Sequence, residues 1–345
     1  MAMERDQKTL VPEPVEDQTI KLEWKKGRIG VPHAFSRSNL FSAGRRYKID
    51  NDIFSDLATS GGFSVKVRGF TSMSIYDLIV FLALMERCWQ QDDDATNARQ
   101  KKTRISCSLG DLASIMGHPR NTSTAQNIFE SLKRLSQTVI EVSGAGYFSG
   151  SLITLASDQP TDKISVGYDV EIYINHKLQD LYSPGHWAAL DPKIIRALGR
   201  NLLAKWLYCF FASHRYKIGS GEGYCYGTQK LQSLSGSNLP AHTFVRRLRT
   251  ALNLINKISY DLAGADDLVY RYALTKGKGT YKVSVNYQRR SALDQTQKPL
   301  LNLGDFIALE QKKDPIKDPI EEDAERFDSE NSDMEAGEWE DERQI

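Results

Sequence analysis

The sequence predicts an α+β protein with two tandem modules, each a helix-turn-helix followed by a β-hairpin. Amphipathic helices and strand-like segments occur twice along the 345-residue chain, in a similar order. In both stretches a glycine-containing turn separates two helices, and strands follow the second helix. This order is typical of the winged-helix fold.

The domain boundaries are predicted from composition. Residues 1–27 are polar, contain two prolines and show no lasting periodicity, so we expect them to be disordered. The first winged-helix domain is expected at 28–185 and the second at 186–292. Residues 293–345 are acidic and interrupted by proline, and we expect a disordered tail there.

The first module begins with an alternating strand-like segment at 63–70 and an apolar helix at 75–89. A strand at 104–108 ends in a serine that favours the start of a helix. After a turn at Gly117, a second helix is expected at 122–136. Three further strands are expected, at 138–143, 151–156 and 164–174.

The second module has a similar pattern. Asp191 and Pro192 predict a helix start, and an apolar-rich helix is expected at 201–214. A short helix opens at Thr228, and the turn at 235–238 separates it from a second helix at about 240–257. Strands at 268–275 and 280–287 flank Lys-Gly-Lys-Gly, which indicates a hairpin.

The helix at 240–257 is suited to the major groove of B-DNA, which admits one α-helix. Its apolar face is Phe244, Leu248, Ala251, Leu252 and Ile255. Its polar face supplies the candidate DNA contacts His242, Thr243, Arg246, Arg247, Arg249, Thr250 and Asn253. Arginine can bridge O6 and N7 of guanine, so this face is typical of a recognition helix.

The predicted hairpin adds the candidate phosphate contacts Lys276, Lys278 and Lys282. Residues 240–290 hold ten Lys and Arg against three Asp, a net charge of +7. A basic face on an amphipathic helix can also be merely solvated. Here the turn, the hairpin and the basic tip occur together, which favours DNA binding.

The second helix of the first module is less basic. Its candidate contacts are Arg120, Thr122, Ser123, Gln126, Asn127 and Lys133, and Asn121, Glu130 and Arg134 are expected on the same face. Asn and Gln can pair with adenine. A purely structural role for this helix remains open.

The charge of the chain is unevenly distributed. The net charge is +1, but residues 314–345 contain fourteen acidic and three basic residues, a net charge of −11. The remaining residues therefore carry +12, which suggests an anionic partner. The acidic tail either competes with that partner or only increases solubility.

The sequence gives little support for a membrane protein, a secreted protein or an enzyme. The most apolar helix, at 202–212, is too short for a membrane span and contains Lys205, and the N-terminus lacks an apolar signal region, so we expect a cytoplasmic protein. No C-x-x-C pair, histidine pair or phosphate-binding glycine loop occurs. We therefore predict no catalytic residue, metal or cofactor.

Three runs and the basic hairpin resemble the TrfA family of plasmid replication initiators. The runs are WAALDPKIIRALGRNLLAKWLYCFFASH at 187–214, VPHAFSRSNLFS at 31–42 and SIYDLIVFLAL at 74–84. The similarity covers roughly residues 28–290. It implies two winged-helix domains that bind repeated sites (iterons) in double-stranded DNA at a plasmid origin in a bacterium.

The resemblance also implies partners. Such initiators open A·T-rich DNA, recruit the host initiator, the replicative helicase and the sliding clamp, and can form a homodimer through the first module. Leu40-Phe41 and residues 297–303 are candidate clamp-binding peptides, although such short matches also occur by chance. Two alternatives stay open: a winged-helix transcriptional repressor, possibly of its own gene, and a protein-binding module.

Overall fold

The computed structural model describes residues 19–22, 24–25, 27–44, 46–90, 100–144, 146–156, 164–214, 224–264, 268–276 and 281–290. The chain divides into two units, Met1–Leu293 and Asp294–Ile345, and every described residue belongs to the first. The expectation for the acidic tail therefore lies outside the described residues.

The first module has the predicted winged-helix order. Its elements are α2 (Ile75–Gln90), β8 (Arg104–Ser108), α3 (Leu109–Met116), α4 (Thr122–Gln137), β11 (Ile153–Ala156) and β12 (Asp169–Ile174). Ser108 caps α3 in a reciprocal pair with Asp111, and Gly117 ends that helix at φ 71°. Strand β12 pairs antiparallel with both β11 and β8.

Strand β12 is shorter than expected, because it begins at Asp169 and not at residue 164. The Tyr168 amide donates to the Ser165 carbonyl over 3.1 Å, which closes a turn before the strand. The carbonyls of Val166 and Tyr168 then accept from the first amides of α3. This segment therefore satisfies a helix terminus and does not extend the sheet.

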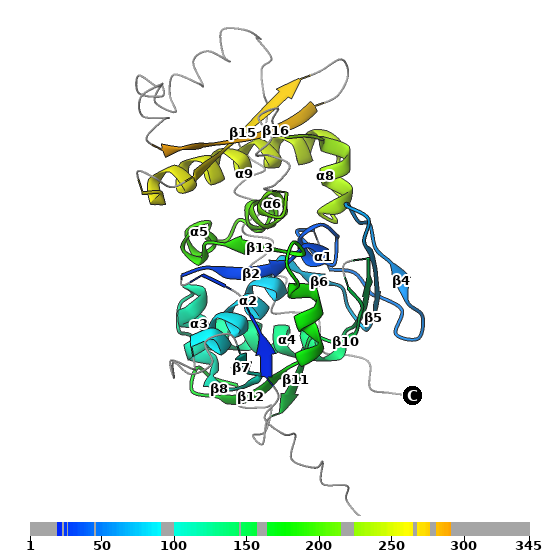
Figure 1. Cartoon of the computed structure of the whole chain (residues 1–345), viewed down its shortest axis with the longest axis vertical. Helices are drawn as coiled ribbons and strands as arrows, with labels where there is room; N and C mark the ends of the chain where they lie inside the picture. Colours follow the sequence, from blue (N-terminus) through cyan, green and yellow to red (C-terminus); the bar gives the residue numbers. More distant parts are fainter. Residues whose placement is uncertain are drawn as a thin grey trace, which may run out of the picture. The chain divides into compact units, whose positions relative to one another are not determined.

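The second module repeats the topology of the first (Figure 1). Its elements are α6 (Leu202–Ala212), β14 (Tyr224–Gly227), α8 (Thr228–Leu234), α9 (Ala241–Leu262), β15 (Leu268–Lys276) and β16 (Tyr281–Arg289). Strand β16 pairs antiparallel with both β14 and β15. In each module the last strand of the wing is central, between the strand that precedes the helix-turn-helix and the first strand of the wing.

Further elements surround the first module. A four-stranded sheet has the order β10 (Phe148–Ser151), β9 (Val139–Ser143), β5 (Ser64–Arg68), β4 (Ser55–Asp56). Strand β1 (Thr19–Lys21) pairs with β7 (Gln100–Lys102), and β3 (Phe41–Ser42) with β6 (Met73–Ser74). Helix α1 (His33–Ser36) precedes β3 in the chain, and the 3-10 helix η2 (His176–Tyr182) follows β12.

The expected disorder of residues 1–27 is wrong at its C-terminal end. Strand β1 is paired, and Ile20, Leu22 and Trp24 are at most 6% exposed. These apolar residues alternate with polar ones, so one face of the segment is buried. Residues 1–27 as a whole are mostly polar, so their composition did not indicate this short alternation. Residues 1–18 lie outside the described part.

The two modules share one hydrophobic core. Strand β2 (Ile29–Pro32) pairs with β13 (Trp187–Leu190), so a strand before the first module lies beside one that opens the second. Arg196, in α5 (Pro192–Ala197), contacts both carboxylate oxygens of Glu86 in α2 at 2.7 Å. The division at residue 185 remains a prediction, but the modules are joined by a sheet and by an ion pair in which Arg196 Nη2 donates to both oxygens of Glu86.

Candidate nucleic-acid interface

Helix α9 is amphipathic in the predicted sense. The residues expected on its apolar face are buried, namely Phe244, Leu248, Ala251, Leu252 and Ile255. The helix ends at Leu262, beyond the predicted end at about Lys257. Ser259 is buried, and residues 258–263 contain no glycine or proline, so nothing in the sequence stops the helix before Leu262.

The opposite face of α9 carries the predicted DNA contacts. His242, Arg246, Arg247, Arg249, Thr250 and Asn253 are exposed, and Thr243 is half-buried. Residues 242, 246, 249, 250 and 253 recur at helical spacing, so they lie along one side of the helix. Arg246 has no salt bridge within the described part of the chain.

The turn before α9 is held by Gln232 of α8. Its Nε2 donates to the Leu239 carbonyl over 2.6 Å and to the Ser237 carbonyl over 3.3 Å. Gly236 has φ 67°, a backbone conformation that favours glycine. No side chain caps α9, whose N-cap residue is Pro240, so the first amides of this helix have no side-chain acceptor.

The wing is fixed to α9 by a side-chain amide. Asn256 Nδ2 donates to the Tyr272 carbonyl over 2.9 Å, and Asn256 Oδ1 accepts from the Tyr272 amide over 2.8 Å. Strand β15 therefore lies along the helix (Figure 1), and β16 pairs with it. Lys276 and Lys282 are exposed near the tip of the hairpin. Lys278 lies outside the described residues.

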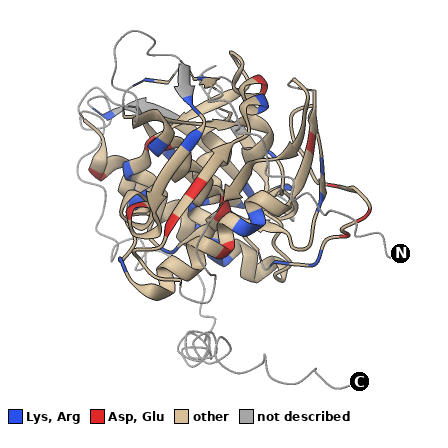
Figure 2. Cartoon of the chain, turned by 90° about the horizontal axis from the view of Figure 1, so that it is seen from below, with Lys and Arg blue, Asp and Glu red and all other residues tan. Residues whose placement is uncertain are grey.

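Helix α4 presents a more neutral surface. Arg120, Thr122, Ser123, Gln126 and Asn127 are exposed, as predicted. Lys133 is only half-exposed, because its ammonium lies 2.8 Å from Glu130 and 4.9 Å from the centre of the Phe129 ring. Acidic and basic residues are interspersed over the first module (Figure 2).

The expectation that Arg134 and Asn121 belong to this DNA-facing set needs correction. The Arg134 guanidinium is 16% exposed and turned inward, with Nη2 2.8 Å from Asp77 Oδ1. Asn121 Oδ1 accepts from the Thr124 amide over 2.8 Å and so caps α4. Both side chains serve the fold, because each satisfies a partner within the module.

Asp77 is the centre of a buried polar cluster that the sequence did not reveal. The residue is fully buried, and its carboxylate accepts from the Ser74 amide and hydroxyl and from Ser131 Oγ. Arg134 supplies the counter-charge, and Arg46 lies 3.8 Å away. The cluster joins the start of α2 to the middle of α4.

The described residues show little sign of metal, disulfide or membrane chemistry. Among the described residues, no three His, Cys, Asp or Glu side chains gather as a metal site would require. The four cysteines are free thiols, and three of them are buried. No described helix combines the length and apolarity of a membrane span.

Comparison with known proteins gave structural matches alone. No protein-family model matches the chain, and no curated protein matches it significantly. Matching solved structures include selenomethionine derivatives of domains 2 and 3 of RctB, with a TM-score of 0.47, 16% identity, and coverage of 74% of this chain and 98% of that chain. A second structure of RctB domains 2–3 gives a TM-score of 0.45, 17% identity, and coverage of 72% and 95%.

Both TM-scores are below 0.5. The resemblance to the TrfA family stays a prediction from the sequence. Its main run forms β13, α5 and α6, and Trp206, Phe210 and Phe211 within it are at most 1% exposed. This run therefore contributes mainly to the core of the protein rather than to the predicted DNA contacts.

Proposed function

We propose that this chain binds double-stranded DNA, with α9 in the major groove and the wing against the phosphate backbone. The main support for this proposal is the outer face of α9. Six exposed side chains that can form hydrogen bonds, three of them arginines, lie on this face, and the other face of the helix is buried. A good bidentate contact from arginine to guanine contributes roughly 1–3 kcal/mol of discrimination. Helix α4 offers a second, more neutral contact surface.

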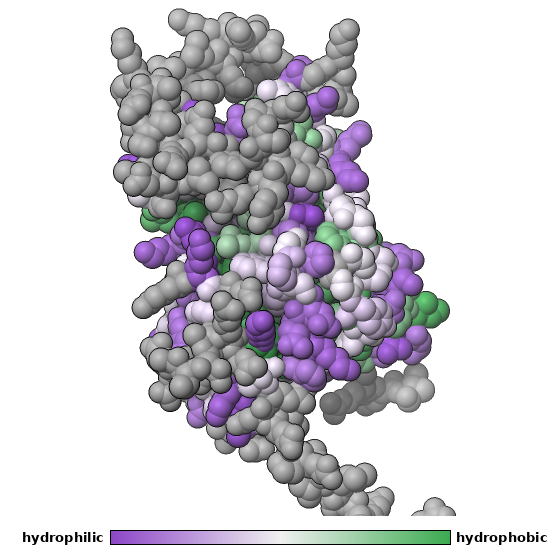
Figure 3. All heavy atoms as spheres, in the orientation of Figure 1, coloured by the Kyte–Doolittle hydropathy of each residue, from purple (hydrophilic) through white to green (hydrophobic). Residues whose placement is uncertain are grey.

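A protein-docking role for α9 fits less well. Stable protein interfaces have an apolar centre that is poor in charged residues. Between residues 242 and 257 every exposed side chain is polar or charged, and large exposed apolar side chains occur only at the C-terminal end of the helix, at Tyr260 and Leu262. The part of the surface that is coloured in Figure 3 mixes hydrophilic and hydrophobic residues. The chemistry of this face therefore favours a nucleic acid.

We further propose that the DNA is a plasmid origin with repeated sites and that the chain initiates replication there, in the cytoplasm of a bacterium. The resemblance to the TrfA family supports this step. The host initiator, the replicative helicase and the sliding clamp would be its partners, and a homodimer its second form. Leu40 and Phe41 are at most 2% exposed and so are poor clamp-binding candidates, while residues 297–303 lie outside the described part.

The first experiment tests DNA binding. The double variant Arg246→Ala plus Arg247→Ala should lose binding to the origin while its circular dichroism and thermal unfolding stay unchanged. Lys193→Ala plus Arg200→Ala removes the same charge from exposed positions outside α9 and should bind normally. Unchanged origin affinity in the α9 variant would remove this helix from the mechanism.

The second experiment separates an initiator from a transcriptional repressor. A plasmid with the origin but without the gene for this protein is introduced into cells that supply the chain in trans. Replication of that plasmid supports the initiator function, and the α9 variant should abolish it. Tight origin binding without replication would favour the repressor.

A further inference from the structure

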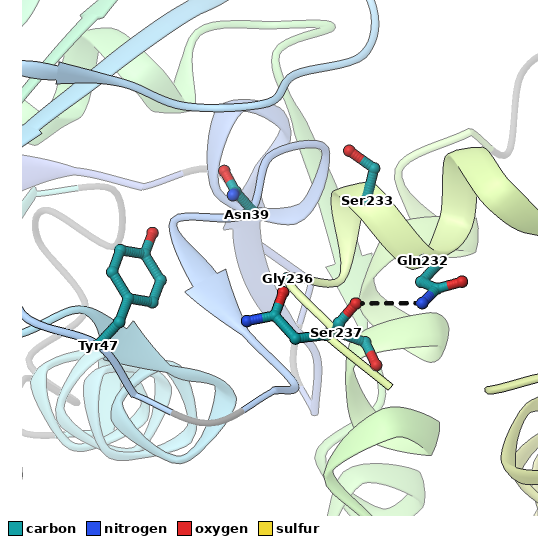
Figure 4. A pocket seen from close by; sticks show the side chains of 7 residues that line it. Asn39, Tyr47, Gln232, Ser233, Gly236 and Ser237 are labelled. Carbon is teal, nitrogen blue, oxygen red and sulfur yellow. Dashed lines mark hydrogen bonds between the residues drawn. The ribbon is translucent and has the colours of Figure 1, made fainter. Parts of the chain in front are cut away.

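A polar groove of about 390 Å³ lies beside the helix-turn-helix of the second module (Figure 4). The first module contributes Asn39 and Tyr47 to one wall. The other wall consists of Gln232 and Ser233 at the end of α8 and of Gly236, Ser237 and Asn238 in the turn before α9. The groove thus combines residues of both modules, and no sequence motif pointed to it.

Backbone contacts fix the two walls together. The Ala43 amide donates to the Ser235 carbonyl over 2.8 Å. Next to this bond Gly44 approaches Gly236 so closely that a Cβ on Gly44 would lie 2.2 Å from the Gly236 oxygen. The Tyr47 amide is bonded to Ser72 Oγ over 2.8 Å. The groove is therefore formed before any ligand binds.

The lining offers neutral hydrogen-bonding groups. Three hydroxyls, from Tyr47, Ser233 and Ser237, and two amides, from Asn39 and Asn238, border the groove, whereas the Gln232 amide nitrogen is bonded to the carbonyls of Ser237 and Leu239. None of the seven lining residues is acidic. Such groups commonly hold DNA phosphates and sugars without recognising the sequence. Lys48, next to Tyr47, is exposed and adds positive charge, whereas the Arg46 guanidinium is turned toward Asp77 and Ser74.

The position of the groove also favours a phosphate. Helix α9 begins three residues after Asn238, and no side chain caps it. The amides of its first turn and the positive end of its dipole therefore favour a negative charge nearby. The same end of α9 carries His242 and Arg246, the first exposed polar residues of the DNA-facing side.

We propose that this groove holds the sugar–phosphate backbone of the duplex whose major groove receives α9. The inference rests on the proposed DNA binding and extends it, because it makes residues 39–48 of the first module part of the second module's DNA site. Neutral donors release few counterions on binding. The groove thus strengthens binding to every sequence and leaves the salt dependence nearly unchanged.

The test uses Tyr47→Phe and Asn238→Ala in the full chain. Each variant should lose roughly 10- to 100-fold in affinity, the range expected for one hydrogen bond to a charged phosphate. The loss should be the same for origin and random-sequence duplexes and at each salt concentration. Tyr147→Phe and Asn51→Ala remove the same groups from exposed positions outside the groove and should bind like the wild type.

A second measurement identifies the contacted phosphate. Duplexes with a neutral methylphosphonate at single positions next to the α9 site are titrated with the wild type and with Tyr47→Phe. At one position the methylphosphonate should lower the affinity of the wild type. The affinity of Tyr47→Phe, which is already lower, should not fall further when the same position is changed. Additive losses at all positions would overturn the inference, as would a loss confined to origin sequences.

The outcomes also separate this inference from the proposed function. Wild-type affinity in both groove variants, together with loss of binding in the Arg246→Ala plus Arg247→Ala variant, would overturn the groove and leave DNA binding by α9 intact. A wild-type chain that binds no duplex at any salt concentration would overturn the proposed function itself.

Discussion

Gly44 and Gly236 bring the backbones of the two modules into direct contact. A Cβ on Gly44 would lie 2.2 Å from the Gly236 oxygen, and one on Gly236 would lie 2.6 Å from Ser42 Cβ. Real Cβ atoms do not approach other atoms this closely, so only glycine fits either position. The first module therefore rests on the turn that orients α9.

Gly44→Ala should force the backbones at residues 44 and 236 apart. Because the neighbouring atoms belong to the backbone, the methyl group can be accommodated only by moving the two modules apart, which costs roughly 1–3 kcal/mol of unfolding free energy. Urea unfolding measures this loss, and duplex binding should weaken with it. Gly167→Ala is the matched control, because its Cβ would meet no atom within 4 Å. Equal stability of the two variants would contradict the prediction.

Asp77→Ala should be far more damaging than the loss of a surface carboxylate. Arg134 would remain in the module as an uncompensated charge, and removing one partner of a buried pair costs roughly 3–5 kcal/mol. The prediction is checked by chemical denaturation. Asp261→Ala removes an exposed carboxylate and should change stability by about 0.5 kcal/mol or less. A similar small loss for Asp77→Ala would show that the cluster contributes little.

His33 should make the protein less stable in acid. The residue is 4% exposed, and burial, with the nearby charge of Arg37, lowers its pKa from 6.5 to about 3. The unfolded chain therefore binds this proton below about pH 6.5, whereas the folded chain binds it only near pH 3. The contribution of His33 to the free energy of unfolding therefore falls as the pH decreases from about 6.5 to about 3. At pH 5 the loss relative to neutral pH is about 2 kcal/mol.

Urea unfolding of His33→Gln and the wild type at several pH values tests this. The variant should lose less stability on acidification, whereas His176→Gln should retain the wild-type dependence. If His33→Gln fails to fold, the ring of His33 can be titrated by NMR in the wild type. A midpoint near 6.5 would contradict the prediction.

The helix-turn-helix of the second module was predictable because its signals are local. Phe244, Leu248 and Ile255 recur at helical spacing, and that spacing also places His242 and Arg246 on the opposite face. The exposed face of α9 as far as Lys257 therefore followed from one periodicity. The hairpin followed from its glycines and from the alternation on either side.

The remaining features depend on residues far apart in the chain. Asp77 contacts Ser131 and Arg134, which are 54 and 57 positions away, and helical periodicity alone could not separate Arg134 from its exposed neighbours. The groove likewise combines Tyr47 with Asn238, and no pattern along the chain relates the two. Such contacts depend on how the modules pack together, and short-range patterns in a single sequence do not show this packing.

Salt should weaken DNA binding steeply. If about six of the basic residues between 240 and 290 neutralise phosphates, affinity falls by roughly a thousandfold between about 50 and 200 mM salt. The Lys276→Ala plus Lys282→Ala variant should lower the slope of log affinity against log salt by about two and weaken origin and random duplexes alike. A slope near zero for the wild type would exclude phosphate contacts as the main source of affinity.

Deletion of residues 314–345 tests whether the acidic tail competes with DNA. This segment carries a net charge of −11 and the remaining chain +12, so an intramolecular attraction to the basic face is expected at low salt. The truncated chain should bind random duplexes more tightly than the full chain at low salt, and the difference should vanish at high salt as the charges are screened. A control tail of equal length, with each Asp and Glu replaced by Asn and Gln, should behave like the deletion. If the full, truncated and neutralised chains bind equally at low salt, the tail does not compete with DNA, and its charge serves solubility instead.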